Sequence, residues 1–271
     1  MRRGSLVLPF VLLATPLWST FASCQSFEGA RPPLGERVGG YLTATSDLSD
    51  LYREVLPSPP AVGSPQDDSD LAAIIHLQSN TKDERWVEAR ADERLLYPRF
   101  AAAFGGPIDR EHTPQLITLL NRIERDAEAP MGAAKDAFKR PRPYQRMQLK
   151  RMCGTATPPA PDPHPAQANS YPSGHTTVGW MAAYLLAEVA PDRRSELLER
   201  ARDYGFSREI CGMHFPSDVA AGRALATAVF DRLQDDAEFK NDLACARAEH
   251  SAATPGAAAP SCRIPLQPIR K

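Results

Sequence analysis

The chain lacks the sequence features of several protein classes. Beyond its N-terminal segment it has no apolar run near the ~20 residues that span a bilayer, and no segment alternates in polarity like a half-buried strand. Basic charge is not in excess, because 32 Lys and Arg residues stand against 33 Asp and Glu residues. A nucleic-acid-binding protein normally carries a basic face. These absences favour a globular, all-α protein with no membrane span and no nucleic-acid partner.

Metal-ligand spacing is also missing. His76, His112, His164 and His250 are scattered along the chain, and no two cysteines have the C-x-x-C spacing of a zinc site. Each of these histidines is expected to be a surface or core residue rather than a ligand. The sequence therefore predicts no metal ion and no other cofactor.

Cysteines are few, but their number is informative. Four of the five follow Cys24, and an even number in an oxidising compartment indicates disulfides with three allowed connectivities. Cys245 and Cys262 are close in sequence, so a bond between them would fix the C-terminal end. A bond between Cys153 and Cys211 would join two segments that carry different motifs.

The N-terminus has the layout of a bacterial export signal. Two arginines precede an apolar stretch, Leu6 to Leu17, and small residues follow. Residues 1–22 are therefore predicted to be a signal peptide, which places the mature protein in the periplasm or outside the cell. A competing interpretation takes the segment ending at Cys24 as a loose lipoprotein box with a lipid anchor on that cysteine.

Helical patterns dominate the rest of the chain. Thr113 and Pro114 have the pattern of a helix start, with a hydroxyl cap followed by proline. Apolar residues then recur at the i, i+3, i+4 and i+7 spacing from Leu116 to Ile123, which predicts one buried stripe. Residues 23–250 are expected to form a single all-α domain.

This domain is predicted to be a bundle of about six to nine helices. Gly105 and Gly205 are expected to end two of them. The proline-rich segments 57–65 and 158–165 are expected to be loops, and residues 251–271 a flexible tail. Further helices are expected over residues 70–78, 83–104, 176–189, 193–204, 217–233 and 237–249.

One cluster of polar residues combines a histidine with a carboxylate. His214 and Asp218 are four residues apart, a spacing that brings side chains together across one helical turn. A carboxylate that accepts from one imidazole nitrogen leaves the other free to attack. Arg208, in a stretch expected to be a loop, can fork onto two phosphate oxygens. The alternative is a surface histidine near a helix-start aspartate, with an arginine that has no role.

A second cluster is a glycine-containing turn that leads into an apolar helix. Ser173 and Gly174 let the backbone approach a ligand, and the N–H groups at a helix start attract an anion. His175 follows directly and is placed to donate a proton. The alternative is an ordinary helix cap made by Ser173.

A third cluster supplies two more cations. Lys135 and Arg142 are seven residues apart, which places them on one face. Prolines flank Arg142 and should end the preceding helix near Lys139. Arg140 is interpreted as part of a solvated basic edge. With Arg208, the three cations can compensate the charge that phosphoryl transfer spreads over three oxygens.

Taken in order, the clusters read K-x6-R-P, P-S-G-H and S-R-x5-H-x3-D. This combination resembles the signature of the type 2 phosphatidic acid phosphatase superfamily. Residues 170–176 and 207–212 further resemble the bacterial class A non-specific acid phosphatases. The resemblance implies a helical bundle of the phosphatidic acid phosphatase and haloperoxidase kind. It also implies metal-independent hydrolysis of a broad range of phosphate monoesters, with transfer to alcohols as a side activity.

The resemblance implies a role for each matched residue. His214 would attack phosphorus and form a phosphohistidine, with Asp218 orienting it, and His175 would protonate the leaving group. Both histidines start from a pKa near ~6.5, so activity is expected to peak on the acidic side of neutrality. The expected phosphate-binding residues are Lys135, Arg142, Ser173, Gly174 and Arg208.

Other functions remain open at this point. Vanadium-dependent haloperoxidases share the signature, because vanadate mimics phosphate. A lipid phosphate phosphatase and a non-enzymatic phosphate-binding protein are further alternatives, although the binding protein would not need two histidines. The natural substrate and a homo-oligomeric state are not determined by the sequence.

Overall fold

A computed structural model describes residues 39–42, 46–94, 96–153, 169–252 and 262. The predicted signal peptide, Cys24, the 158–165 segment and nearly all of the predicted tail lie outside these residues. Within the described residues the regular elements are helices, and the only strand-like pairing is an isolated bridge between Pro141 and Asn169. The all-α prediction is confirmed.

Within the described residues there are seven longer α-helices and three short ones (α1, α4 and α6), one more in total than the predicted maximum of nine. Short 3-10 helices cover Ser46–Asp50, Tyr97–Arg99 and Pro191–Arg193. The α-helices are α1 (Leu51–Val55), α2 (Pro65–Asn80), α3 (Asp83–Arg94), α4 (Ala101–Phe104), α5 (Pro114–Phe138), α6 (Pro143–Arg146), α7 (Gly174–Val189), α8 (Arg194–Ile210), α9 (Pro216–Leu233) and α10 (Ala237–His250).

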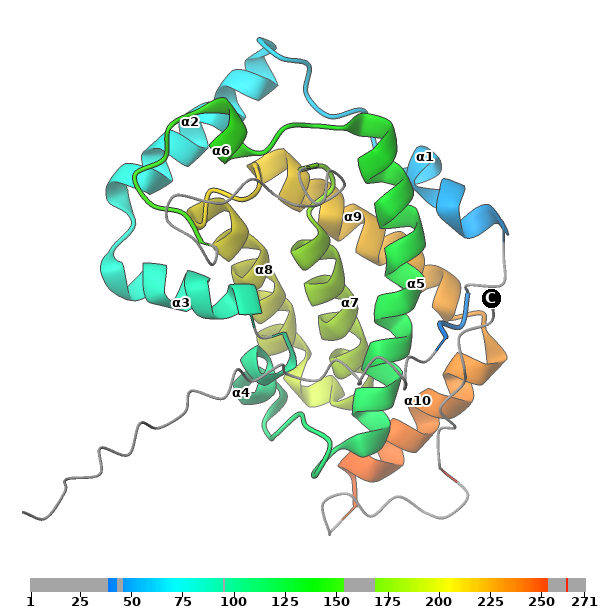
Figure 1. Cartoon of the computed structure of the whole chain (residues 1–271). Coiled ribbons are helices and arrows are strands. Elements are labelled where there is room, and N and C mark those ends of the chain that lie inside the picture. Colours follow the sequence, from blue (N-terminus) through cyan, green and yellow to red (C-terminus); the bar gives the residue numbers. More distant parts are fainter. Residues whose placement is uncertain (1–38, 43–45, 95, 154–168, 253–261, 263–271) are drawn as a thin grey trace, which may run out of the picture.

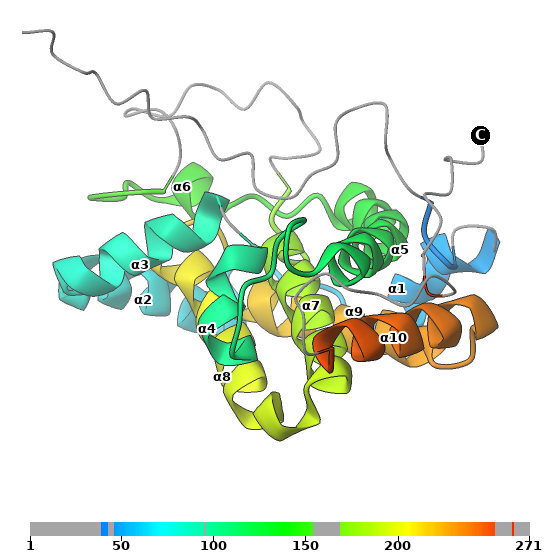
Figure 2. The same ribbon diagram turned by 90° about the horizontal axis from the view of Figure 1, so that it is seen from below.

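Helix α7 lies at the centre of the molecule. Helices α2, α3 and α8 are on one side of it, and α1, α5 and α10 are on the other (Figures 1 and 2). Helix α7 packs directly against α5, α8, α9 and α10. Its side chains are buried around most of the circumference, including Trp180, Met181, Leu185 and Leu186. A helix that is apolar all round is stable only when covered, so its composition explains its central place.

Helix α5 begins and ends where the sequence predicts. Its stripe from Leu116 to Ile123 is buried, and the helix ends at Lys139, which has a positive φ of 47°. The prediction that the Thr113 hydroxyl caps this helix is wrong, however, because the hydroxyl bonds to the backbone of Asp109. The carboxylate of Glu249 accepts the first N–H groups of the helix instead. The cap therefore comes from α10, far along the chain.

Two predicted helix boundaries are also wrong. The helix expected over 83–104 is interrupted after Arg94, because Pro98 cannot continue the hydrogen-bond ladder. The helix expected to end near Gly205 continues to Ile210. There the missing side chain permits close packing, since a Cβ on Gly205 would lie 3.2 Å from Thr176 and from Val219.

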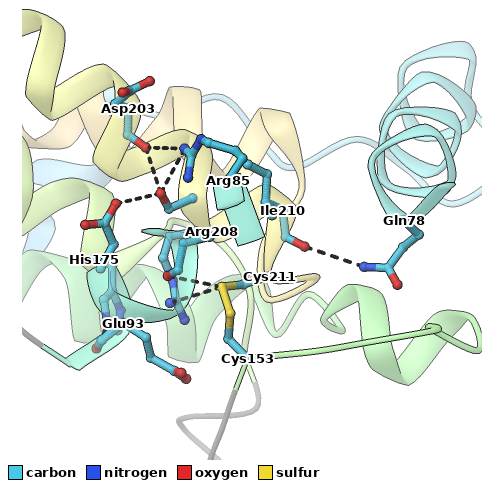
Figure 3. The surroundings of a disulfide bond; sticks show 12 residues. Gln78, Arg85, Glu93, Cys153, His175, Asp203, Arg208, Ile210 and Cys211 are labelled. Carbon is cyan, nitrogen blue, oxygen red and sulfur yellow. Dashed lines mark hydrogen bonds between the residues drawn. A yellow bond between two sulfur atoms is a disulfide. The ribbon is translucent and has the colours of Figure 1, made fainter. Parts of the chain in front are cut away.

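Two disulfides join distant parts of the chain. Cys153 bonds to Cys211 at the end of α8, and Cys245 in α10 bonds to Cys262. Both pairs match the bonds that the sequence suggested. The first one fixes the segment that follows α6 against the last turn of α8 (Figure 3). In the described part of the chain, no helix has the length and apolarity needed to cross a bilayer.

Candidate active site

The site residues converge from several helix ends around the N-terminus of α7. Lys135 comes from the end of α5, and Arg142 lies just before α6. Arg208 lies in the last turn of α8, and His214 precedes α9. The electrostatic fields of Arg142, Lys135 and Arg208 all act on His214. The structure thus brings together the cations that were predicted from separate motifs.

The hydrogen bonds of His214 define its tautomer. Its Nδ1 lies 2.8 Å from the backbone carbonyl of Ser170, which can only accept, so Nδ1 carries a proton. Its Nε2 lies 3.1 Å from Nη1 of Arg142, which can only donate, so Nε2 presents a lone pair. Burial, followed by the charges of Arg142 and Lys135, holds the pKa of His214 well below its usual range. The imidazole is therefore neutral, with its lone pair on Nε2.

The sequence suggested that Asp218 accepts a hydrogen bond directly from His214, but it does not. The distance from Oδ2 to Nδ1 of His214 is 3.8 Å, too long for a hydrogen bond. Oδ2 instead accepts from the Ser170 hydroxyl at 2.5 Å and from the Phe215 N–H at 2.7 Å. The four-residue spacing places the two side chains near each other, but the Ser170 hydroxyl and the Phe215 N–H bind the carboxylate oxygen instead.

Arg140 is not part of a solvated edge, which corrects the prediction. It is buried, and its guanidinium lies 2.6 Å from Asp218 and 2.8 Å from Asp70 in α2. It also donates to the Ser217 hydroxyl at 2.6 Å and packs 4.4 Å from the ring of Phe215. The carboxylates of Asp70 in α2 and Asp218 in α9 contact the guanidinium from two sides and replace the water that would otherwise solvate its charge.

Arg208 is a buried cation without a carboxylate partner in the part of the chain that the structure describes. It is 1% exposed. Its one hydrogen bond is a long contact with the Cys211 sulfur, and its Nε has none (Figure 3). Burial lowers its pKa. The charge of Glu93 partly offsets this effect, but no ion pair joins the two groups within the described residues, so the buried guanidinium is chemically suited to bind an anion.

Lys135 is held by a reciprocal contact with Asn169. Its Nζ donates to the Asn169 carbonyl at 2.8 Å, and the Asn169 side chain donates back to the Lys135 carbonyl at 3.0 Å. Burial, helped by the charge of Arg142, lowers the pKa of Lys135 to about 7. The ammonium is therefore charged at acidic pH and loses its proton near neutrality.

The turn before α7 acts as a helix cap. The Ser173 hydroxyl accepts from the Thr176 N–H and from the Thr176 hydroxyl at 2.8 Å. The capping alternative is therefore correct for the hydroxyl oxygen, which still keeps its own hydrogen as a donor. A Cβ on Gly174 would lie 2.9 Å from the sulfur of Met131, so a larger residue there would push this flexible side chain aside.

His175 lies in the first turn of α7. Its Nε2 is 3.1 Å from the carbonyl of Glu93 in α3, and its ring stacks on Tyr204 at 6.4 Å. Burial and then the charge of Arg208 hold its pKa well below the usual range. Both histidines thus depart from the value of ~6.5 on which the sequence argument was based. Within the described residues, no group of three or more His, Cys, Asp or Glu side chains is arranged to hold a metal ion.

Known proteins match this arrangement. Residues 118–231 match the model of the PAP2 superfamily. An acid phosphatase of Zymomonas mobilis is 34% identical over 77% of this chain and 80% of its own length. A non-specific acid phosphatase of Providencia stuartii is 35% identical over 88% and 96%. A non-specific acid phosphatase of Salmonella typhimurium is 32% identical over 72% of this chain and 78% of its own length. The chain belongs to the PAP2 superfamily.

The PAP2 match extends from α5 into α9 and includes every predicted site residue from Lys135 to Asp218. It also includes three residues whose roles the sequence argument missed: Arg140, Asn169 and Ser170. No local pattern singled out Arg140, because its carboxylate partners Asp70 and Asp218 are 70 and 78 positions away. No local pattern indicated Asn169 or Ser170, because both act through contacts with residues more than 30 positions away.

Proposed function

We propose that this PAP2 phosphatase hydrolyses phosphate monoesters through a phosphohistidine formed on Nε2 of His214. The observation that carries the proposal is the state of this imidazole. Its Nδ1 proton is fixed on the Ser170 carbonyl, and its Nε2 lone pair faces Arg142. A fixed tautomer beside buried cations is what attack on phosphorus requires.

The cations are proposed to bind the phosphoryl oxygens. Arg208 has no carboxylate partner among the described residues, and Lys135 and Arg142 lie near the same imidazole. A bound phosphate would accept from these side chains and from the Ser173–Gly174 turn. Positioning and charge compensation of this kind provide most of the catalysis in phosphoryl transfer. In this proposal the protein supplies that compensation without a metal.

The reaction consists of two displacements. In the first, the Nε2 lone pair of His214 attacks phosphorus, the P–O bond to the leaving group breaks, and His175 gives the leaving oxygen a proton. In the second, His175 takes a proton from water, the water oxygen bonds to phosphorus, and the P–N bond breaks. The Nε2 of His175 donates to Glu93, so its other ring nitrogen exchanges the proton. An alcohol in place of water would give transfer instead of hydrolysis.

Acidic conditions are proposed to suit this site. His214 must be neutral to attack, and its lowered pKa keeps it so below pH 7. Lys135 must be charged, which holds below its pKa of about 7. The proton of His175 is favoured when the negative phosphate offsets the charge of Arg208.

The proposed location is the periplasm or the exterior of the cell. The two disulfides support an oxidising compartment, and the sequence begins with a predicted export signal. We also propose a broad substrate range, because the matched residues all surround the phosphate. A panel of nucleotides, sugar phosphates and lipid phosphates, with fractionation of the producing cells, tests both proposals.

The experiment that tests the function is an assay of p-nitrophenyl phosphate hydrolysis with His214→Ala. We expect a loss of roughly 10⁴-fold or more, together with full activity of the wild type in EDTA. Vanadate should inhibit hydrolysis and should not produce halide oxidation. Retained activity of the variant, or halide oxidation with vanadate, would reject the proposal.

His175 can be tested separately through the leaving group. Loss of a general acid typically costs ~10²–10⁴-fold. His175→Ala should lose more activity on alkyl phosphates than on p-nitrophenyl phosphate, because nitrophenolate leaves without a proton. Equal losses on the two substrates would contradict the acid role.

A further inference from the structure

We propose that the Ser170 hydroxyl keeps the Asp218 carboxylate off the imidazole of His214, so that this nucleophile stays unprotonated at acidic pH. Ser170 is thus a positioning residue that adapts the site to acid. The inference rests on the proposed function, because it concerns the protonation state of the proposed nucleophile.

Ser170 contacts both partners with different groups. It is fully buried, and its N–H donates to the Arg140 carbonyl at 2.7 Å. Its own carbonyl accepts the Nδ1 proton of His214 at 2.8 Å. Its hydroxyl donates to Oδ2 of Asp218 at 2.5 Å and lies 3.4 Å from the same Nδ1. The hydroxyl therefore binds the carboxylate and lies beside the imidazole, whose Nδ1 proton is held by the carbonyl of the same residue.

The remaining bonds of Asp218 support this spacing. Oδ2 also accepts from the Phe215 N–H, and Oδ1 accepts from Arg140 at 2.6 Å. With these donors the carboxylate is satisfied while it stays 3.8 Å from Nδ1 of His214. Without the hydroxyl, Oδ2 would lack one donor, and the Nδ1–H of His214 is the nearby group that can replace it.

The difference between the two acceptors is electrostatic. A neutral carbonyl fixes the tautomer without strongly favouring the imidazolium, whereas a carboxylate in direct contact stabilises the charged form. The charges that face His214 come from every surrounding element: Lys135 of α5, Arg142 before α6, His175 of α7, Arg208 of α8 and Asp218 of α9. Asp218 also forms an ion pair with Arg140. Together with the charge of Asp70, its charge adds to the effect of burial in raising the pKa of Glu209. Direct contact with the Asp218 carboxylate would oppose the effect of the cations.

The test compares pH profiles of kcat/KM for wild type and Ser170→Ala. The acid limb of such a profile reports ionisations of the free enzyme and substrate, and the substrate is the same in both assays. We expect the limb to move to higher pH by about one pH unit or more. Adding Asp218→Asn to Ser170→Ala should return the limb to lower pH, even though the total activity falls.

Ser207→Ala is the matched control. Ser207 is also fully buried and donates to an aspartate, Asp92, at 2.6 Å, but this pair does not contact His214. The acid limb of the Ser207→Ala profile should stay at the wild-type pH even if its activity falls. A Ser170→Ala profile that is only scaled down would overturn the proposal. So would a shifted limb that persists in the double variant.

A measurement on the wild type covers the case in which Ser170→Ala does not fold. Nitrogen-15 NMR of the full chain, with the His214 signals assigned by their loss in His214→Ala, reports charge and tautomer. At pH 5 we expect a neutral ring protonated on Nδ1, and an imidazolium at that pH would overturn the proposal. His214→Ala itself tests the proposed function, so the two failures are distinguishable.

Discussion

The guanidinium of Arg140 and the carboxylate of Asp218 form a buried ion pair, with 2.6 Å between Nη1 and Oδ1. The same guanidinium contacts Asp70 at 2.8 Å. Helices α2 and α9 are thereby joined through a residue that lies between α5 and α6. Removal of one member of a buried pair is expensive because the other charges remain.

Arg140→Gln should therefore destabilise the fold by ~3–5 kcal/mol and lower kcat, because Asp218 loses its principal donor. Urea unfolding and steady-state assays at pH 5.5 check this prediction. Lys139→Gln is the matched control, since Lys139 is exposed and adjacent. If the two variants behave alike, Arg140 has no such role.

A second prediction concerns the contact of α9 with the turn before α7. A Cβ on Gly222 would lie 2.6 Å from the backbone oxygen of Ser173 and 3.0 Å from the Cβ of Thr176. Because backbone atoms cannot move aside cheaply, Gly222→Ala should displace the turn that carries His175. We expect destabilisation of ~1–3 kcal/mol and a loss of activity approaching ~10²-fold.

Gly132→Ala provides the control for this substitution. Gly132 lies inside α5, and nothing lies within 4 Å of a Cβ built there. Alanine should therefore stabilise the helix by about 1 kcal/mol with unchanged kinetics. Full activity of Gly222→Ala would show that the turn tolerates the displacement.

The sequence predicted the clustered cations and histidines of the candidate site better than it predicted the residues that hold them in place. Lys135, His175 and His214 lie in short motifs, and the structure brings them together. The role of Arg140 depends on Asp70 and Asp218, which are 70 and 78 positions away. No local pattern contains such contacts.

The helices were predictable for a similar reason. Local periodicity fixed the start of α5 and nearly all of α7. It could not reveal that Gly205 lies inside α8, because this depends on side chains of α7 and α9 packed against it. The position of Arg208 in a helix, rather than in a loop, follows from that packing.

A third prediction follows from the lowered pKa of Lys135. The ammonium loses its proton as the pH rises through about 7, so one of the three cations is lost above that value. KM for a phosphate monoester should therefore rise between pH 7 and 8.5. Lys135→Arg keeps its charge throughout this range and should show a smaller rise. Identical KM profiles for the two proteins would contradict the assignment.

A fourth prediction concerns stability. Asp126 accepts from the N–H groups of Tyr41 and Leu42, but burial still raises its pKa to about 7. Between pH 4 and 7 the folded protein thus keeps a proton that the unfolded chain has released. The stabilisation that this retained proton gives to the folded protein is full below about pH 4 and is lost as the pH rises to 7.

The free energy of unfolding of the wild type in urea should therefore fall relative to that of Asp126→Asn from pH 4.5 to 7. The opposite contributions of His175 and His214, whose pKa values are lowered, are common to both proteins and cancel in this comparison. The pKa of Asp67 is lowered to about 2, first by its hydrogen bond to Arg146, and its contribution is lost only below about pH 4. Measurements above pH 4.5 separate the two effects. A stability difference between the two proteins that stays constant from pH 4.5 to 7 would exclude this role of Asp126.

The central claim is the covalent bond between His214 and phosphorus. Rapid acid-free quenching with a ³²P-labelled monoester, followed by peptide mapping and NMR of the labelled peptide, tests it most directly. We expect one acid-labile, alkali-stable phosphate per chain, attached to Nε2 of His214 and absent from His214→Ala. Label on another residue, on Nδ1, or on no residue during rapid turnover would contradict this account.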